Sequence, residues 1–177
     1  IEIKNQEEIA KMRIAGKLAA DVLEMIEPHV KSGVTTNELN QLCADYTEQV
    51  QNAISAPLNY HGFPKSICTS VNHVVCHGIP DDTPLKDGDI INIDITVIKD
   101  GYHGDTSKMF LIGDVSPEDK RLCRITQESL YLALKKVKPG VAFGEIGATI
   151  QKFIKKSGRY SIVKEYCGHG IGKEFHE

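Results

Sequence analysis

The chain has 177 residues, of which 41% are hydrophobic and 25% are charged, a composition typical of one folded domain and not of a disordered polypeptide. Its 21 lysines and arginines against 24 aspartates and glutamates give a net charge of −3, which argues against a general nucleic-acid binder or a polybasic membrane anchor. No apolar run approaches the roughly 20 residues that a membrane-spanning helix needs. The 5 cysteines are scattered without a Cys-x-x-Cys pair, so we expect reduced thiols in a cytoplasmic protein.

The first elements along the chain are two predicted helices. The Asn-x-x-Glu pattern at residues 5–8 is typical of a capping box and opens a helix whose apolar spacing continues up to Pro28. A second such pattern, Thr-x-x-Glu at residues 35–38, opens a helix that should reach about residue 50. Prolines and glycines then punctuate residues 54–80, which predicts short strands and loops.

A β-hairpin is predicted next. Residues 89–98 alternate between apolar and polar side chains, the dipeptide Asp-Gly at 100–101 is a turn signal, and residues 102–112 form the return strand. With a two-residue turn, Asp94 and Asp105 become diagonal neighbours on one face, roughly 7–8 Å apart at the backbone. A solvated polar face is one interpretation of this pair.

The second interpretation of Asp94 and Asp105 is a metal site. Two carboxylates this close repel each other unless a proton or a cation lies between them. Carboxylate oxygens together with an imidazole suit a divalent ion such as Mn, Fe, Co or Zn. A carboxylate pair of this kind can also hold two ions about 3.5–4 Å apart.

Two more helices are predicted after the hairpin. Ser116 followed by Pro117 marks the start of a helix that runs to about residue 137. A fourth helix should begin near Phe143 and end before Gly158.

An internal repeat relates the two helix pairs. Residues 31–39 resemble residues 138–146 at a constant offset of 107 positions, so a helix, a Gly-Val turn and a helix occur twice. We therefore expect a single domain over 1–177 built from two repeats. The first repeat covers about 1–115. Residues 116–177 would form the start of the second repeat, whose C-terminal strands are absent.

Several histidines are candidate functional residues. His77 ends an apolar strip before a Gly-Ile-Pro turn, where a buried structural histidine is the alternative. His169 stands among three glycines at alternate positions, which let a backbone approach a ligand closely, and His176 follows it. His103 lies on the same side of the hairpin as Asp105, and both a surface role and a functional role remain open for it.

Five stretches of the chain match a known family. They read Tyr-His-Gly-Phe-Pro-Lys-Ser at 60–66, Val-Cys-His-Gly-Ile-Pro at 75–80, Asp-Gly-Asp-Ile-Ile-Asn-Ile-Asp at 87–94, Gly-Tyr-His-Gly-Asp-Thr-Ser at 101–107 and Gly-His-Gly-Ile-Gly at 168–172. In these stretches, and over essentially all its length, the chain resembles the bacterial type I methionine aminopeptidases, which are metallopeptidases of the pita-bread fold. The resemblance implies an α+β fold of two pseudo-symmetric halves, each of helices and antiparallel sheet, with the second half incomplete here.

The resemblance also implies site residues. Two divalent ions (Co, Mn, Fe or Zn) would be bridged or chelated by Asp94 and Asp105, and one of them would be bound by His169. As catalytic residues, His77 would contact the substrate and His176 would contact the scissile carbonyl and stabilise the tetrahedral intermediate. The apolar pocket for a methionine side chain would be lined by Tyr60, Phe63, Cys68 and Phe175.

The function that the resemblance implies is removal of the initiator methionine from nascent chains in the cytoplasm. The expected enzyme is a monomer without membrane or nucleic-acid partners, and the ribosome is allowed as a partner. The family completes its site with two glutamates in its C-terminal quarter that have no counterpart here, so we expect the 177-residue chain to be impaired. Two alternatives remain: a proline-specific peptidase of the same fold, and a non-catalytic binding module built on it.

Overall fold

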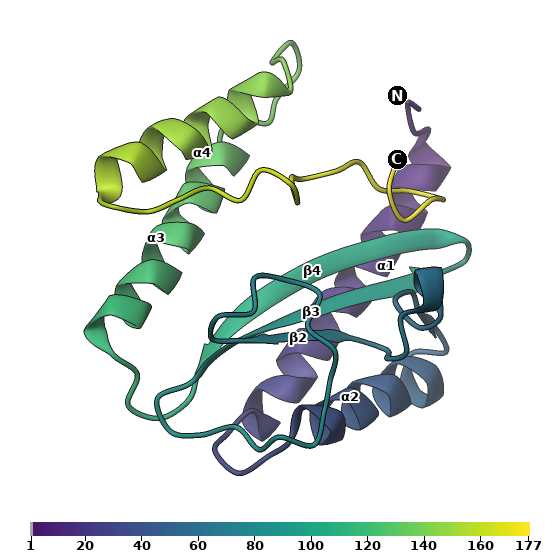
Figure 1. Cartoon of the computed structure of the whole chain (residues 1–177). Coiled ribbons are helices and arrows are strands. Elements are labelled where there is room, and N and C mark those ends of the chain that lie inside the picture. The colour runs from purple at the N-terminus through teal and green to yellow at the C-terminus, as the bar shows by residue number, and fades with distance from the viewer. Residues whose placement is uncertain (1) are drawn as a thin grey trace. The chain divides into compact units, whose positions relative to one another are not determined.

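The computed structural model describes residues 2–177 and divides them into two compact units (Figure 1). The first unit runs to Val115 and includes the C-terminal segment His169–Glu177, and the second comprises Ser116–Gly168. No helix within residues 2–177 combines the length and apolarity needed to cross a membrane.

The first unit begins with two helices, as the capping patterns predict. Helix α1 spans Gln6–Ile26, and the Asn5 side chain accepts a hydrogen bond from a first-turn amide, so the capping box is formed. A 3₁₀ turn at Glu27–His29 contains the proline that ends the helix. Helix α2 spans Thr36–Asp45 and widens into a single π-helical turn at Tyr46–Val50, where the sequence predicted one continuous α-helix.

A four-stranded antiparallel sheet follows, with β3 (Ile90–Lys99) at its centre. Strand β4 (Tyr102–Leu111) pairs with one edge of β3, while β1 (Ile54–Ser55) and β2 (Cys68–Val71) pair with the other edge at successive positions. The β3–β4 turn has two residues, both with positive φ, as a type I′ turn requires.

The hairpin has the predicted register. Asp94 lies opposite Ser107, and Thr96 lies opposite Asp105. The two aspartates are therefore diagonal neighbours on one face of the sheet, as the alternation and the turn together predict.

The two faces of this sheet differ. Helices α1 and α2 cover one face (Figure 1), where the side chains of β3 at positions 91, 93, 95 and 97 are at most 1% exposed and form the core with α1 and α2. On β4, Gly104 points to the same face, and a Cβ there would lie 2.2 Å from the Ala15 carbonyl group. Only glycine therefore lets α1 lie this close to β4. The polar side chains of the hairpin, among them Asp94 and Asp105, lie on the opposite face.

The second unit is a helix pair. Helix α3 spans Pro117–Leu134 and is capped by the Ser116 side chain, and helix α4 spans Gly144–Ser157. Helix α3 ends three residues earlier than the predicted residue 137. The Arg121 guanidinium of α3 donates a 2.6 Å hydrogen bond to the Ser157 carbonyl at the end of α4, satisfying an acceptor that the helix itself leaves free.

Candidate functional site

A cavity of about 520 Å³ lies on the polar face of the β3–β4 hairpin, within the first unit. Its lining contains all of the residues selected from the sequence, namely Tyr60, Phe63, Cys68, His77, Asp94, Asp105, His169, Phe175 and His176. These residues come from β2, β3, β4, two loops and the C-terminal segment. The fold therefore brings together side chains up to 116 positions apart in the sequence, the separation of Tyr60 and His176.

The carboxyl groups of Asp94 and Asp105 lie together in the cavity. Burial, the negative charge of Asp105 and a hydrogen bond shared between the two carboxyl groups together raise the pKa of Asp94 to about 7, and burial contributes most. Two ionised carboxylates can only accept hydrogen bonds, so this contact needs a proton between them. A divalent cation would remove the same repulsion.

The imidazole of His169 lies beside this pair in a defined tautomer. Its Nδ1 is 2.8 Å from the Gly170 carbonyl oxygen, and because that oxygen only accepts, Nδ1 donates. The Nε2 lone pair is then directed toward Asp105, whose Oδ2 is 3.6 Å away. Metal-binding histidines are typically oriented in this way, with one ring nitrogen held by a carbonyl and the other free to coordinate.

The side chains of Asp94, Asp105 and His169 are of the types that bind divalent ions, but they are not arranged around a common point. Two carboxylates and an imidazole suit Mn, Fe, Co or Zn. Across residues 2–177, however, no three His, Cys, Asp or Glu side chains already converge as a set of ligands. Binding one ion to Asp94, Asp105 and His169 together therefore requires a side-chain adjustment.

A group of aromatic rings forms one wall of the cavity. The rings of Phe175 and His176 are stacked, with centroids 4.6 Å apart and an interplanar angle of 7°. The Tyr60 hydroxyl lies 2.8 Å from Nδ1 of His176. Burial, together with the neighbouring His169, lowers the pKa of His176, so its imidazole stays neutral at neutral pH.

The loop that carries His77 runs beside β2 and comes into close contact with it at Gly78. A Cβ at Gly78 would lie 2.0 Å from the Thr69 carbonyl oxygen, so only glycine fits. The Thr69 amide donates to the Gly78 carbonyl at 2.9 Å, and the Gly78 amide donates to the Ser70 hydroxyl at 3.2 Å. These bonds fix the loop beside β2 and direct His77, which has a positive φ, to the cavity.

The apolar part of the lining includes Cys68. Burial raises the pKa of its thiol to about 12, and the nearby Asp94 carboxylate contributes to the shift. The thiol therefore stays protonated and acts as a small apolar group rather than as a thiolate ligand.

Two polar side chains of the lining, those of Thr96 and His61, were not among the residues selected from the sequence. Thr96 follows Asp94 on the same face of β3 and lies opposite Asp105, and the alternation of the strand was a sufficient signal for it. His61 lies beside Tyr60, with ring centroids 4.3 Å apart, and has φ +47°. No sequence signal marks that unusual backbone conformation.

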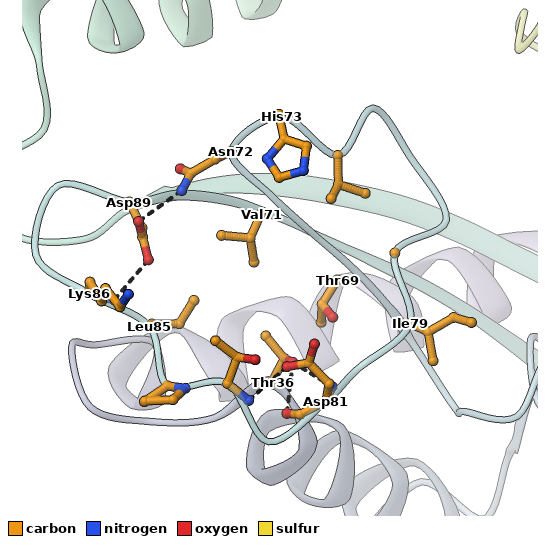
Figure 2. A pocket seen from close by; sticks show the side chains of 14 residues that line it. Thr36, Thr69, Val71, Asn72, His73, Ile79, Asp81, Leu85, Lys86 and Asp89 are labelled. Atoms are coloured by element: carbon orange, nitrogen blue, oxygen red, sulfur yellow. Dashed lines mark hydrogen bonds between the residues drawn. The ribbon is translucent and has the colours of Figure 1, made fainter.

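A second cavity, of about 320 Å³, lies between the start of α2, β2 and the loop that follows β2 (Figure 2). Its carboxylates are already used: Asp89 accepts from Asn72 and from the Lys86 amide, and Asp81 accepts from the Thr83 amide. The buried Thr69 hydroxyl has no partner among the described residues, and the cavity has room for a water molecule to provide one.

The chain is similar to known proteins in sequence and in fold. Residues 10–177 match the family described as metallopeptidase family M24. The chain is 66% identical over 178 aligned positions to the methionine aminopeptidase of Escherichia coli strain K12, covering 100% of this chain and 67% of the relative. It is also similar to solved methionine aminopeptidases from Rickettsia prowazekii (TM-score 0.97, 55% identity) and Thermotoga maritima (TM-score 0.96, 32% identity), covering 100% of this chain and 71% of each.

These matches confirm the α+β class and the pita-bread fold expected from the sequence. The chain spans about two thirds of the length of these relatives.

Proposed function

Because the chain belongs to metallopeptidase family M24, we propose that it is a metal-dependent aminopeptidase that removes N-terminal methionine from peptides. One observation carries the proposal: Nε2 of His169 and the carboxyl pair Asp94–Asp105 face one another in the cavity. Three electron-pair donors in one cavity are stable when a cation neutralises them. The relatives reported above carry the same activity in their names.

We propose Asp94, Asp105 and His169 as the metal ligands, with two divalent ions per site drawn from Co, Mn, Fe and Zn. A bound ion would supply Lewis-acid polarisation of the peptide carbonyl and lower the pKa of a water molecule. Asp94 must lose its proton to become a ligand, so its raised pKa makes binding dependent on pH. Three donors hold an ion weakly, and we expect slow turnover by this chain.

The apolar side of the cavity is proposed to receive the methionine side chain. Phe63 and Phe175 line it together with the protonated thiol of Cys68. Thioether sulfur packs favourably against aromatic rings, and an unbranched side chain fits an irregular apolar space. The carboxylates on the other side of the cavity would lie near the peptide amino group.

His176 is proposed to stabilise the charge that develops on the scissile carbonyl oxygen. If the Tyr60 hydroxyl donates to Nδ1 of His176, the proton of the neutral ring lies on Nε2, which can donate to that oxygen. His77, which lines the same cavity, is proposed to contact the substrate and to hold it near the carboxylates. The lowered pKa of His176 keeps the ring in the neutral form that this tautomer requires.

The cellular setting is part of the proposal. Nascent chains are the proposed substrates. The enzyme is proposed to be a cytoplasmic monomer without membrane or nucleic-acid partners, and the ribosome is an allowed partner. Cys43, Cys68, Cys76, Cys123 and Cys167 are all free thiols in the structure, which agrees with a reducing compartment. Sedimentation of the purified chain, alone and with ribosomes, tests the monomeric state and the association with ribosomes.

A peptide panel tests the activity. With Mn²⁺ or Co²⁺ added, we expect methionine release from Met-Ala peptides, loss of release with a chelator, and no cleavage of X-Pro peptides. Preferential X-Pro cleavage would favour the proline-specific alternative. Absence of both cleavage and stoichiometric metal uptake in calorimetry would favour the non-catalytic module and overturn the proposal.

A further inference from the structure

The C-terminal segment, residues 169–177, carries two of the four histidines that line the cavity but forms no helix or strand. Its position therefore depends on individual contacts with the rest of the first unit. Those contacts decide whether His169 faces Asp105 and whether His176 reaches Tyr60. The residues that hold the segment are candidates for a role in the site without touching a substrate.

His103, on β4, makes two hydrogen bonds to this segment, and both go to the same carbonyl oxygen. Its backbone amide donates to the Gly172 carbonyl oxygen at 2.8 Å, and its ring Nδ1 lies 3.0 Å from the same oxygen. Because a carbonyl oxygen only accepts, Nδ1 carries the ring proton and also donates. The two lone pairs of the oxygen are thereby used by a single residue.

The His103 ring also begins a row of aromatic rings that ends at the candidate ligand. Its centroid lies 5.4 Å from that of Phe175. Phe175 stacks on His176, and His176 contacts His169 edge to face with centroids 4.4 Å apart. Each ring restricts the next, so a displacement of His103 would be transmitted to His169.

We infer that His103 is a positioning residue, which holds the C-terminal segment so that His169 and His176 face the Asp94–Asp105 pair. Asp105 lies two positions along the same strand on the same face. One strand therefore supplies a carboxylate and also fixes the imidazole beside it. The predicted effects on catalysis and on metal affinity rest on the proposed function, whereas the effect on the order of the segment does not.

Three substitutions separate the hydrogen bond of the His103 ring from its packing against Phe175. His103→Asn keeps an N–H group at the position of Nδ1 but removes the ring. His103→Phe keeps the ring and removes the donor, and His103→Ala removes both. His29→Ala is the matched control, because His29 is an exposed histidine in the 3₁₀ turn after α1 and does not line the cavity.

The test is amide hydrogen exchange of peptides spanning the C-terminal segment, together with Mn²⁺ titration by calorimetry on the full chain. For His103→Ala we expect exchange in the segment to rise by roughly fivefold or more and Mn²⁺ affinity to fall by about tenfold or more. Exchange in β3 should not change. His103→Asn and His103→Phe should each restore part of both losses, and if the alanine variant does not fold, these two variants carry the test.

The inference is wrong if the folded His103 variants match His29→Ala in exchange and in Mn²⁺ affinity. Activity is assayed separately. If the unsubstituted chain releases no methionine but exchange responds as expected, the proposed function fails and the positioning role stands. If the chain is active and the variants match the control, the positioning role fails and the proposed function stands.

Discussion

The β3–β4 hairpin and the C-terminal segment supply the candidate ligands in different ways. The hairpin places Asp94 and Asp105 by backbone pairing over its whole length, with an apolar face buried under α1 and α2. The C-terminal segment places His169 without regular structure, through His103 and through the ion pairs Lys4–Glu177 and Lys173–Glu8. In Figure 1 the hairpin is the long teal ribbon, and the segment is the yellow chain end.

This difference teaches where the site is rigid and where it can adjust. A slip of the hairpin by one residue would turn every buried isoleucine to the polar face, so its register is strongly specified. The segment depends on a small number of polar contacts, some of them exposed and weakened by salt. Adjustment of the site around an ion should therefore occur on the side of His169 and not on the side of the carboxylates.

The largest expected effect is loss of the carboxylate pair. Asp94→Asn should reduce Mn²⁺ affinity by about 100-fold or more and methionine release by roughly a thousandfold, because a neutral amide replaces a charged ligand. Asp100→Asn is the matched control, since Asp100 lies in the hairpin turn with φ +50°, which asparagine tolerates. Calorimetry and peptide assays that gave equal values for the two variants would contradict the metal site.

The next effect tests the buried face of the hairpin. Gly104→Ala places a Cβ against the Ala15 carbonyl group, where neither backbone can move away, and we expect a loss of about 2–3 kcal/mol in the free energy of unfolding. Gly16→Ala, in open space on α1, should instead stabilise the chain by roughly 0.5–1 kcal/mol. Urea unfolding of both variants gives the comparison, and an unchanged midpoint for Gly104→Ala would disprove the close contact.

The third effect is a pH dependence of the metal-free chain. The pKa of Asp94 is raised by folding from 3.8 to about 7, so its contribution to stability is fully present below pH 3.8, falls as the pH rises and is lost above about 7. Urea unfolding in a chelator should show this decline, and Asp94→Asn should remove it. Metal affinity should change in the opposite direction, increasing as the pH rises through 7. A profile for the unsubstituted chain that is as flat as that of Asp94→Asn would refute the raised pKa.

The smallest effect concerns the C-terminal segment. Lys4→Gln removes the ion pair with Glu177, whose two side chains are 12% and 19% exposed. Because this is one of several contacts of the segment, we expect less than about a threefold rise in amide exchange of residues 173–177 at low salt. The difference should disappear at about 1 M salt, where charges are screened. Lys11→Gln, which breaks an i,i+4 pair with Glu7 on α1, is the control. A large rise in exchange that persists at high salt would show that the Lys4–Glu177 ion pair stabilises the segment more than this prediction allows.

Local patterns accounted for much of the fold. The two capping boxes and the alternation of β3 specified helices, register and the shared face of Asp94 and Asp105, because these features depend on neighbours in the sequence. The helix after Thr35 was expected to continue unchanged to residue 50, but its last turn is π-helical. Periodicity does not distinguish the two kinds of turn.

The positions of the site side chains outside the hairpin could not be predicted from local sequence patterns. The placement of His77 depends on Gly78 crossing β2, and that of His169 depends on a contact with His103 from a distant strand. Such contacts join positions far apart in the sequence, and no local pattern encodes them. The residues Tyr60, Phe63, Cys68, Phe175 and His176 were selected through the family resemblance, and their roles remain predictions.

The central claim is that Asp94, Asp105 and His169 hold a divalent cation. The most direct measurement is anomalous X-ray scattering from crystals of this chain grown with Mn²⁺. The account predicts an anomalous peak within about 2.0–2.3 Å of a carboxylate oxygen of each aspartate and of Nε2 of His169. Fully occupied Mn²⁺ elsewhere on the chain, with no peak at these three side chains, would contradict it.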